Sequence, residues 1–146
     1  KRERARMIEV LAYGTLRDPQ YQRALFDVTM PTRPGTLQGW FVVIHEEGFL
    51  TLVAAPGETV TGDLVTLDDE ALAIADAWEE IPLYERLRAE ARTAGGEPVP
   101  CWVYVRPTAS RERPSAGETA RHARREVLER IRDFRRSAGG GALRPE

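Results

Sequence analysis

The stretch MIEVLAYGTLRDPQYQRALF, residues 7–26, decides how this chain of 146 residues begins to fold. Its first part, Met7 to Tyr13, is rich in β-compatible side chains and stops at Gly14, which predicts a buried strand that ends in a tight turn. The part from Asp18 to Phe26 predicts a helix, because Pro19 suits the first helical turn. The chain therefore opens with a strand, a glycine turn and a helix.

Short strands and turns are expected after this opening unit. TMPTRPG (29–35) has the prolines and glycine of a loop, and HEEG (45–48) suits a turn between two strands within 37–55. A second turn at Pro56-Gly57 should precede a strand over 59–67, in which Gly62 marks a bend or a close backbone approach. The alternating segment 84–92, a turn at 94–98 and an apolar strand at 100–107 complete this region.

Two further helices are predicted. LDDEALAIADAWEE (67–80) offers Asp68 or Asp69 as N-cap, and residues 118–136 place Ala120, Val127, Ile131 and Phe134 on one stripe. Many short strands with a few helices indicate an α+β domain, a curled mixed sheet with an appended C-terminal helix. We expect a domain at 7–107, a polar linker at 108–117, the amphipathic helix at 118–136 and a flexible tail at 137–146.

Composition excludes several classes of protein. Lys and Arg number 21 against 23 Asp and Glu, a net charge of −2, which argues against a general nucleic-acid binder. The apolar runs are too short for a membrane span, and the single Cys101 cannot form a disulfide within the chain. With no signal-like segment near the start, we expect a cytoplasmic protein.

The basic residues are unevenly distributed. All of them except Lys1 are arginine, which is typical of GC-rich coding DNA and favours a bacterial source. Residues 111–136 carry nine Arg against five acidic residues, so a basic C-terminal segment follows an acidic body.

The turn Tyr13-Gly14-Thr15-Leu16-Arg17 is the first candidate for a functional site. A glycine at the end of a buried strand lets consecutive N–H groups converge on a carboxylate or a developing oxyanion. The alternative is a strand-to-helix turn with a structural role only. The residues alone do not decide between an anion-binding turn and a structural one.

Glu79 is the second candidate. Winding the helix at about 100° per residue gathers Ala71, Leu72, Ile74, Ala75 and Trp78 into one apolar arc. Glu79 falls inside this arc, whereas Asp76 and Glu80 fall outside it. A carboxylate that faces a core loses hydration, which raises its pKa and suits it to general acid–base work. The alternative is a Glu that bends to water or pairs with Arg86 or Arg88.

Other chemistry has little support in the sequence. His45 and His122 lie far apart, no cluster has metal-ligand spacing, and no phosphate-binding glycine motif occurs. We therefore expect no metal and no cofactor, and Cys101 in an apolar strand is expected to be a small core residue.

Five pieces of sequence, taken in order, resemble the γ-glutamylcyclotransferase-like family, which includes γ-glutamylamine cyclotransferases and the butirosin-pathway enzyme. They are YGTLR (13–17), VTGDLVTL (60–67), DAWEE (76–80), YER (84–86) and WVYV (102–105). The resemblance implies a small mixed β-barrel flanked by helices. It also implies a γ-glutamyl substrate whose own α-amino group attacks the γ-carbonyl, so that 5-oxoproline and a free amine are released.

The resemblance assigns roles to the two candidate sites. Glu79 would be the general acid/base, and the turn at Gly14, Thr15 and Leu16, with Arg17, would hold the glutamyl part, while Tyr13 and Tyr84 would shape the pocket. Two positions depart from the family pattern: Glu80 replaces a usual glycine, and Phe49-Leu50 replaces a usual Tyr-Pro pair in the wall that faces the leaving amine.

Three questions stay open at the level of sequence. The released amine is not specified. A γ-glutamyl amide hydrolase and a non-catalytic binding domain of the same fold are alternatives to the cyclotransferase. The C-terminal helix is expected to pack on the domain, with a homodimer contact through Val127, Ile131 and Phe134 as the alternative.

Overall fold

A closed barrel of five strands forms the body of the computed structural model, which describes residues 7–46, 49–79, 84–114 and 124–137. The strands are β1 (Ile8–Ala12), β2 (Thr32–Ile44), β3 (Leu50–Leu67), β4 (Glu85–Thr93) and β5 (Pro98–Val105). Their order around the barrel is β1-β3-β2-β4-β5, and β5 closes it by pairing parallel with β1 at Val10–Trp102. The other pairs are antiparallel. The predicted α+β class, a small mixed barrel with helices, is confirmed.

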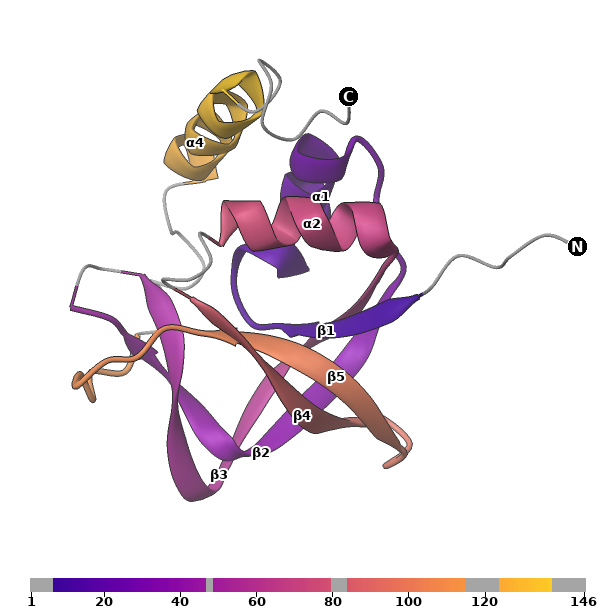
Figure 1. The fold of residues 1–146 in the computed structure, drawn as a ribbon. Helices are drawn as coiled ribbons and strands as arrows, with labels where there is room; N and C mark the ends of the chain where they lie inside the picture. Colours follow the sequence, from indigo (N-terminus) through magenta and orange to yellow (C-terminus); the bar gives the residue numbers. More distant parts are fainter. Residues whose placement is uncertain (1–6, 47–48, 80–83, 115–123, 138–146) are drawn as a thin grey trace, which may run out of the picture.

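The helices α1 (Pro19–Phe26), α2 (Asp69–Trp78) and α4 (Arg124–Ser137) gather on one side of the barrel, over β1 (Figure 1). α1 and α2 each begin at an aspartate N-cap, and the sequence analysis predicted the one of α2. Asp18 accepts a hydrogen bond from the backbone N–H of Gln20 (2.8 Å), and Asp68 accepts one from that of Ala71 (2.8 Å). Asp68, of the two predicted alternatives, is thus the N-cap of α2.

β1 is buried on both faces, which explains its continuous apolar run. Val10 belongs to the core between barrel and helices, and Leu11 belongs to the core inside the barrel. The two side chains are 0% and 1% exposed. Because successive strand residues point to opposite faces, this short strand contributes side chains to both cores. Packing on both faces therefore holds the end of the strand, at Ala12, in a fixed position.

Two predicted breaks in the β-region are wrong. Thr32–Gly35 of the expected loop already pairs with β3, and Pro56-Gly57 lies within β3 instead of ending a strand. The pairing shifts register between Gln38–Thr59 and Trp40–Ala54, so Gly39 alone faces residues 55–58. Gly39 and Gly57 both have positive φ. The turn residues therefore form a bulge, which bends the long hairpin so that the barrel can close.

The predicted HEEG turn includes residues 47–48, which lie outside the described residues. At its edges the backbone N–H of His45 donates to the carbonyl oxygen of Phe49 (2.6 Å).

Gly62 makes the close backbone approach that the sequence predicts as one of two possibilities. A Cβ at this position would lie 2.4 Å from the carbonyl oxygen of Ala12. The chain around both residues is paired, Ala12 opposite Asp63 and Gly35 opposite Gly62, so neither strand can move aside easily.

Gly62→Ala is therefore expected to lower the free energy of unfolding by about 1–3 kcal/mol, as overpacking does in cores. Urea unfolding measures this change. Gly95→Ala is the matched control, because its Cβ would meet no atom closer than 3.9 Å, and it should change stability by less than about 0.5 kcal/mol. Equal stabilities for the two variants would contradict the close approach.

α4 packs against α1. Ile131 is 1% exposed, and Leu128 and Phe134 pack against the same core. The guanidinium of Arg135 donates to the carbonyl oxygens of Ala24 (3.0 Å) and Leu25 (2.6 Å), which lie in the last turn of α1. A cation that binds these carbonyls complements the negative end of a helix.

The boundaries predicted for the C-terminal region can be compared only in part. Of the helix expected at 118–136, residues 118–123 lie outside the described residues, and the helix ends at Ser137. The expected linker at 108–117 is described to Pro114 and is held to the barrel: the N–H of Ile44 donates to the carbonyl oxygen of Glu112 (2.8 Å). Ile131 and Phe134 are engaged within the chain, and the homodimer contact stays a prediction.

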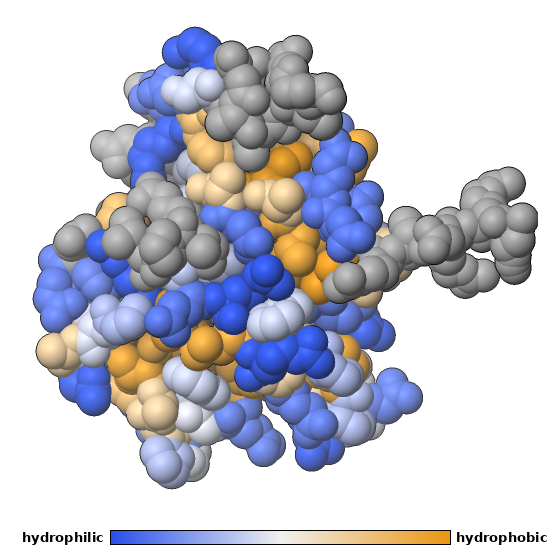
Figure 2. Space-filling view, in the orientation of Figure 1, coloured by the Kyte–Doolittle hydropathy of each residue, from blue (hydrophilic) through white to orange (hydrophobic). Residues whose placement is uncertain are grey.

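Hydrophilic side chains predominate on the face in Figure 2, and apolar ones reach the surface in patches over the helices and the barrel wall. Among the described residues, no helix has the length and the apolar composition that a membrane span requires.

Candidate active site

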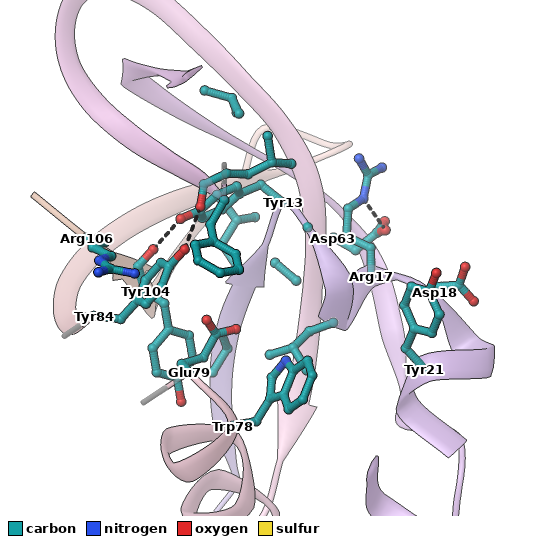
Figure 3. A pocket seen from close by; sticks show the side chains of 18 of the residues that line it. Tyr13, Arg17, Asp18, Tyr21, Asp63, Trp78, Glu79, Tyr84, Tyr104 and Arg106 are labelled. Atoms are coloured by element: carbon teal, nitrogen blue, oxygen red, sulfur yellow. Dashed lines mark hydrogen bonds and ion pairs between the residues drawn. The ribbon is translucent and has the colours of Figure 1, made fainter. Parts of the chain in front are cut away.

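A cavity of about 730 Å³ opens where the end of β1, the turn after it and the end of α2 meet (Figure 3). Residues from β3, β5 and α4 complete its wall. This volume lies within the range of about 300–1,000 Å³ that is typical of small-molecule sites. Six of the predicted site residues line it: Tyr13, Gly14, Leu16, Arg17, Glu79 and Tyr84.

The turn after β1 is held by a buried side chain that the sequence analysis did not single out. The backbone N–H of Arg17 donates to the carbonyl oxygen of Gly14 (3.0 Å) in the short 3-10 helix Thr15–Arg17. The side chain of Gln22, which is 0% exposed, donates to the carbonyl oxygen of Leu16 (2.7 Å). It also accepts from the N–H of Met30 (2.9 Å). Gln22 therefore ties the turn to α1.

Thr15 lies in this turn between Gly14 and Leu16. Arg17 also lines the cavity, and its Nε donates to the carboxylate of Asp63 on β3 (2.9 Å). The positive charge of Arg17 is therefore compensated by a neighbour within the same wall.

Glu79 caps the C-terminal end of α2 and is half-buried in the cavity wall. Its backbone N–H donates to the carbonyl oxygen of Ala75 (2.9 Å), which continues the helical geometry. Ala71 and Ala75 of the predicted apolar arc are buried, and Trp78 packs against the same core. The arc thus faces the core, and the end of α2 faces the cavity.

Asp76 points elsewhere, although it is on the same helix. Its Oδ1 accepts a hydrogen bond from the hydroxyl of Tyr104 (2.6 Å) and lies 3.0 Å from the Nε of Arg86. The ion pair that the sequence considered for Glu79 with Arg86 is therefore made by Asp76. Of these two carboxylates, Glu79 is the one in the cavity wall.

Tyrosines surround Glu79. The hydroxyl of Tyr13 donates to the carbonyl oxygen of Tyr104, and that of Tyr84 donates to the carbonyl oxygen of Leu50 (2.9 Å). Burial raises the pKa of Tyr13 well above its usual value, and the charge of Glu79 raises it further. Burial and the hydrogen bond to Asp76 raise the pKa of Tyr104. Both hydroxyls are therefore neutral donors at physiological pH.

These shifts predict how stability depends on alkaline pH. In the unfolded chain Tyr13 and Tyr104 ionise near pH 10, whereas in the folded chain they keep their protons to higher pH. The unfolded state thus binds fewer protons, and stability should fall as pH rises above about 10. Absorbance at 295 nm should show a step that coincides with loss of near-ultraviolet circular dichroism. Tyr104→Phe should reduce this step, and ionisation of every tyrosine in the folded protein would contradict the prediction.

Phe49 and Leu50, which the resemblance places in the wall that faces the leaving amine, both line the cavity. Several other lining residues were not predicted: Arg106 directly follows β5, and Arg130 lies on the polar face of the predicted C-terminal helix. Tyr104 belongs to the WVYV piece that carries the resemblance, which is the one signal that could have identified it. In the part of the chain that the structure describes, no group of three His, Cys, Asp or Glu side chains could hold a metal ion. Cys101 is buried, and burial raises the pKa of its thiol.

The barrel with its flanking helices defines a fold class that solved structures share. A protein from Arabidopsis thaliana superposes with a TM-score of 0.70 at 19% identity, over 97% of this chain and 90% of that one. A structure described as a gamma-glutamyl cyclotransferase gives 0.67 at 16% identity, over 87% of each chain. An AIG2-like protein from Mus musculus gives 0.59 at 24% identity, over 72% and 80%. These likenesses show a shared fold.

The family follows from the sequence itself. The family model "Gamma-glutamyl cyclotransferase, AIG2-like" matches residues 10–123, so the chain belongs to this family. A comparison with curated proteins gave no significant match. The family and the fold together support an activity of the cyclotransferase type. The match ends before α4 begins at Arg124.

Proposed function

We propose that the protein is a γ-glutamyl cyclotransferase, which releases 5-oxoproline and a free amine from a γ-glutamyl amine or peptide. The observation that carries this proposal is the place of Glu79, in the wall of the cavity that the Tyr13–Arg17 turn also lines. A proton-transfer group and a turn suited to an anion thus face one space. The family to which the chain belongs supports the same reaction type.

The proposed reaction needs no external nucleophile. The α-amino nitrogen of the substrate forms a bond to its own γ-carbonyl carbon, and the bond from that carbon to the leaving nitrogen breaks. Because the nucleophile is tethered, ring closure benefits from a large effective molarity. The protein has to hold the folded conformer of the substrate and to transfer two protons from the attacking nitrogen to the leaving nitrogen. No cofactor enters this balance.

Glu79 is proposed to move these protons. Its carboxylate accepts one proton from the α-ammonium group, which frees the nitrogen lone pair for attack, and gives it to the departing nitrogen. After the attack it accepts the second proton of the attacking nitrogen, which leaves with the released amine as an ammonium group. Tyr13, kept neutral by its raised pKa, is a hydrogen-bond donor beside Glu79 rather than a competing base. The turn at Gly14 and Leu16 is proposed to receive the substrate's α-carboxylate, which is consistent with its anchoring by Gln22.

A panel of γ-glutamyl amines, with products identified by mass spectrometry, tests the proposal. Release of 5-oxoproline together with the free amine is the expected result. Release of glutamate would identify a hydrolase in which Glu79 activates water. Binding of these compounds without any turnover would favour a non-catalytic binding domain. Either of the last two outcomes overturns the proposed reaction.

A further inference from the structure

The positive charges of the cavity are divided between its two sides. Arg17 lies on one side and is paired with Asp63, at 2.9 Å. Arg106 lies on the opposite side, beside Tyr84 (Figure 3). Glu79 and Trp78 lie between Arg106 and Arg17. Arg106 and Arg130 both lie within 6 Å of the ring of Phe49, at 5.8 and 5.3 Å from its centre. Two guanidinium groups thus meet at one aromatic side chain.

Two aromatic rings contact the guanidinium of Arg130. Its guanidinium is 5.3 Å from the centre of the Phe49 ring and 5.5 Å from that of Trp78, the residue before Glu79. Among the described residues, no carboxylate forms an ion pair with it. Aromatic contacts hold a guanidinium in place but do not use its N–H donors, which match a carboxylate in a bidentate geometry.

We propose that Arg130 binds an anionic group on the leaving amine, so that γ-glutamyl amines whose amine part carries a carboxylate are preferred substrates. This inference rests on the proposed function. The cavity is larger than a glutamyl group alone would fill. Arg130 shares the Phe49 ring with Arg106, which lies across Glu79 from Arg17 of the turn that is proposed to hold that group. Glu79 must reach the departing nitrogen, so the amine part extends past Glu79 toward Phe49 and Arg130.

The inferred specificity comes from outside the family domain. The family match covers residues 10–123, whereas Arg130 is on α4, whose Ile131 is buried against the helices of the domain. Docking of this helix therefore places a charge in the cavity wall that the matched domain does not contain. Its position on the rim also explains why Arg130 itself is exposed.

The test compares two substrates of similar size, γ-glutamyl-β-alanine and γ-glutamyl-propylamine. The wild-type protein should have a higher kcat/KM for the acidic substrate, by about tenfold, the effect of one charge-assisted contact. Arg130→Gln should remove this preference and leave kcat/KM for the neutral substrate within about twofold. Arg130→Glu should prefer a substrate with a cationic amine part, so its kcat/KM should be higher for γ-glutamyl-ethylenediamine than for γ-glutamyl-β-alanine. Arg132→Gln, an exposed neighbour on the same helix, is the matched control and should behave like the wild type.

The outcomes separate this inference from the proposed function. If the wild type forms 5-oxoproline from both substrates at equal kcat/KM, or if Arg130→Gln lowers both equally, the inference fails and the proposed function stands. If neither substrate yields 5-oxoproline although others of the panel do, acidic amines are not preferred and the inference again fails. If no γ-glutamyl amine is turned over, the proposed function fails with it. Thermal melting of each variant confirms that the fold is retained.

Discussion

Glu79→Gln is expected to lower kcat for 5-oxoproline release by about 100- to 10,000-fold, the range that general acid–base groups contribute. The amide is nearly isosteric with the carboxylate, so substrate should still fit the cavity, but it cannot accept the proton of the α-ammonium group. Single-turnover kinetics on a good γ-glutamyl amine measures the chemical step directly. KM should change little, because proton transfer contributes to the transition state rather than to substrate binding.

The control for this variant lies on the same helix. Glu70 is exposed in the first turn of α2, and Glu70→Gln should leave kcat unchanged. The backbone N–H of Glu79, which donates to the carbonyl oxygen of Ala75, is unchanged in Glu79→Gln, and thermal melting checks that this variant is folded. Full 5-oxoproline release by folded Glu79→Gln would remove Glu79 from the mechanism, and the family's reaction would then need another proton carrier in this chain.

Local patterns predicted the parts of the fold that local physics determines. The apolar run of β1, the helix that starts at Pro19 and the aspartate cap of α2 depend on neighbours in sequence, and the structure has them where the sequence placed them. The apolar arc of α2 also singled out Glu79 rather than Asp76, because a helix repeats every 3.6 residues. The family resemblance added the closure of the barrel, which periodicity alone indicated only as a curled sheet.

Features that depend on contacts distant in sequence were not predictable in this way. Pro56-Gly57 has the signature of a turn, and only the pairing of β3 with β2 on both sides converts it into a bulge. In the sequence, Gln22 is an ordinary polar residue of a predicted helix. Its role depends on its hydrogen bonds with the backbone of Leu16 and of Met30. In the sequence, Arg130 belongs to the polar face of the C-terminal helix. It lines the cavity only because α4 packs on the domain. In each case a tertiary contact decides what a local pattern leaves open.

Ile131→Ala should have the largest effect on stability among single substitutions in α4, lowering the free energy of unfolding by about 2–4 kcal/mol. Ile131 is 1% exposed and lies in the core that α1, α2 and β1 share, so truncation leaves a cavity there. For a chain of this length, that change corresponds to a fall in melting temperature of roughly 5–15 °C. Arg132→Ala, at the exposed neighbouring position, should change the melting temperature by less than about 2 °C.

This substitution also distinguishes a helix that belongs to the folding unit from one that is merely attached. If α4 folds with the barrel, Ile131→Ala should unfold in one transition at lower temperature, because the Trp78–Phe134 edge-to-face contact and the Arg135 contacts to α1 are lost together with the core. A wild-type melting temperature would show that α4 contributes nothing to the core. It would also undermine Arg130 as a specificity residue, since an undocked helix cannot hold a guanidinium between Phe49 and Trp78.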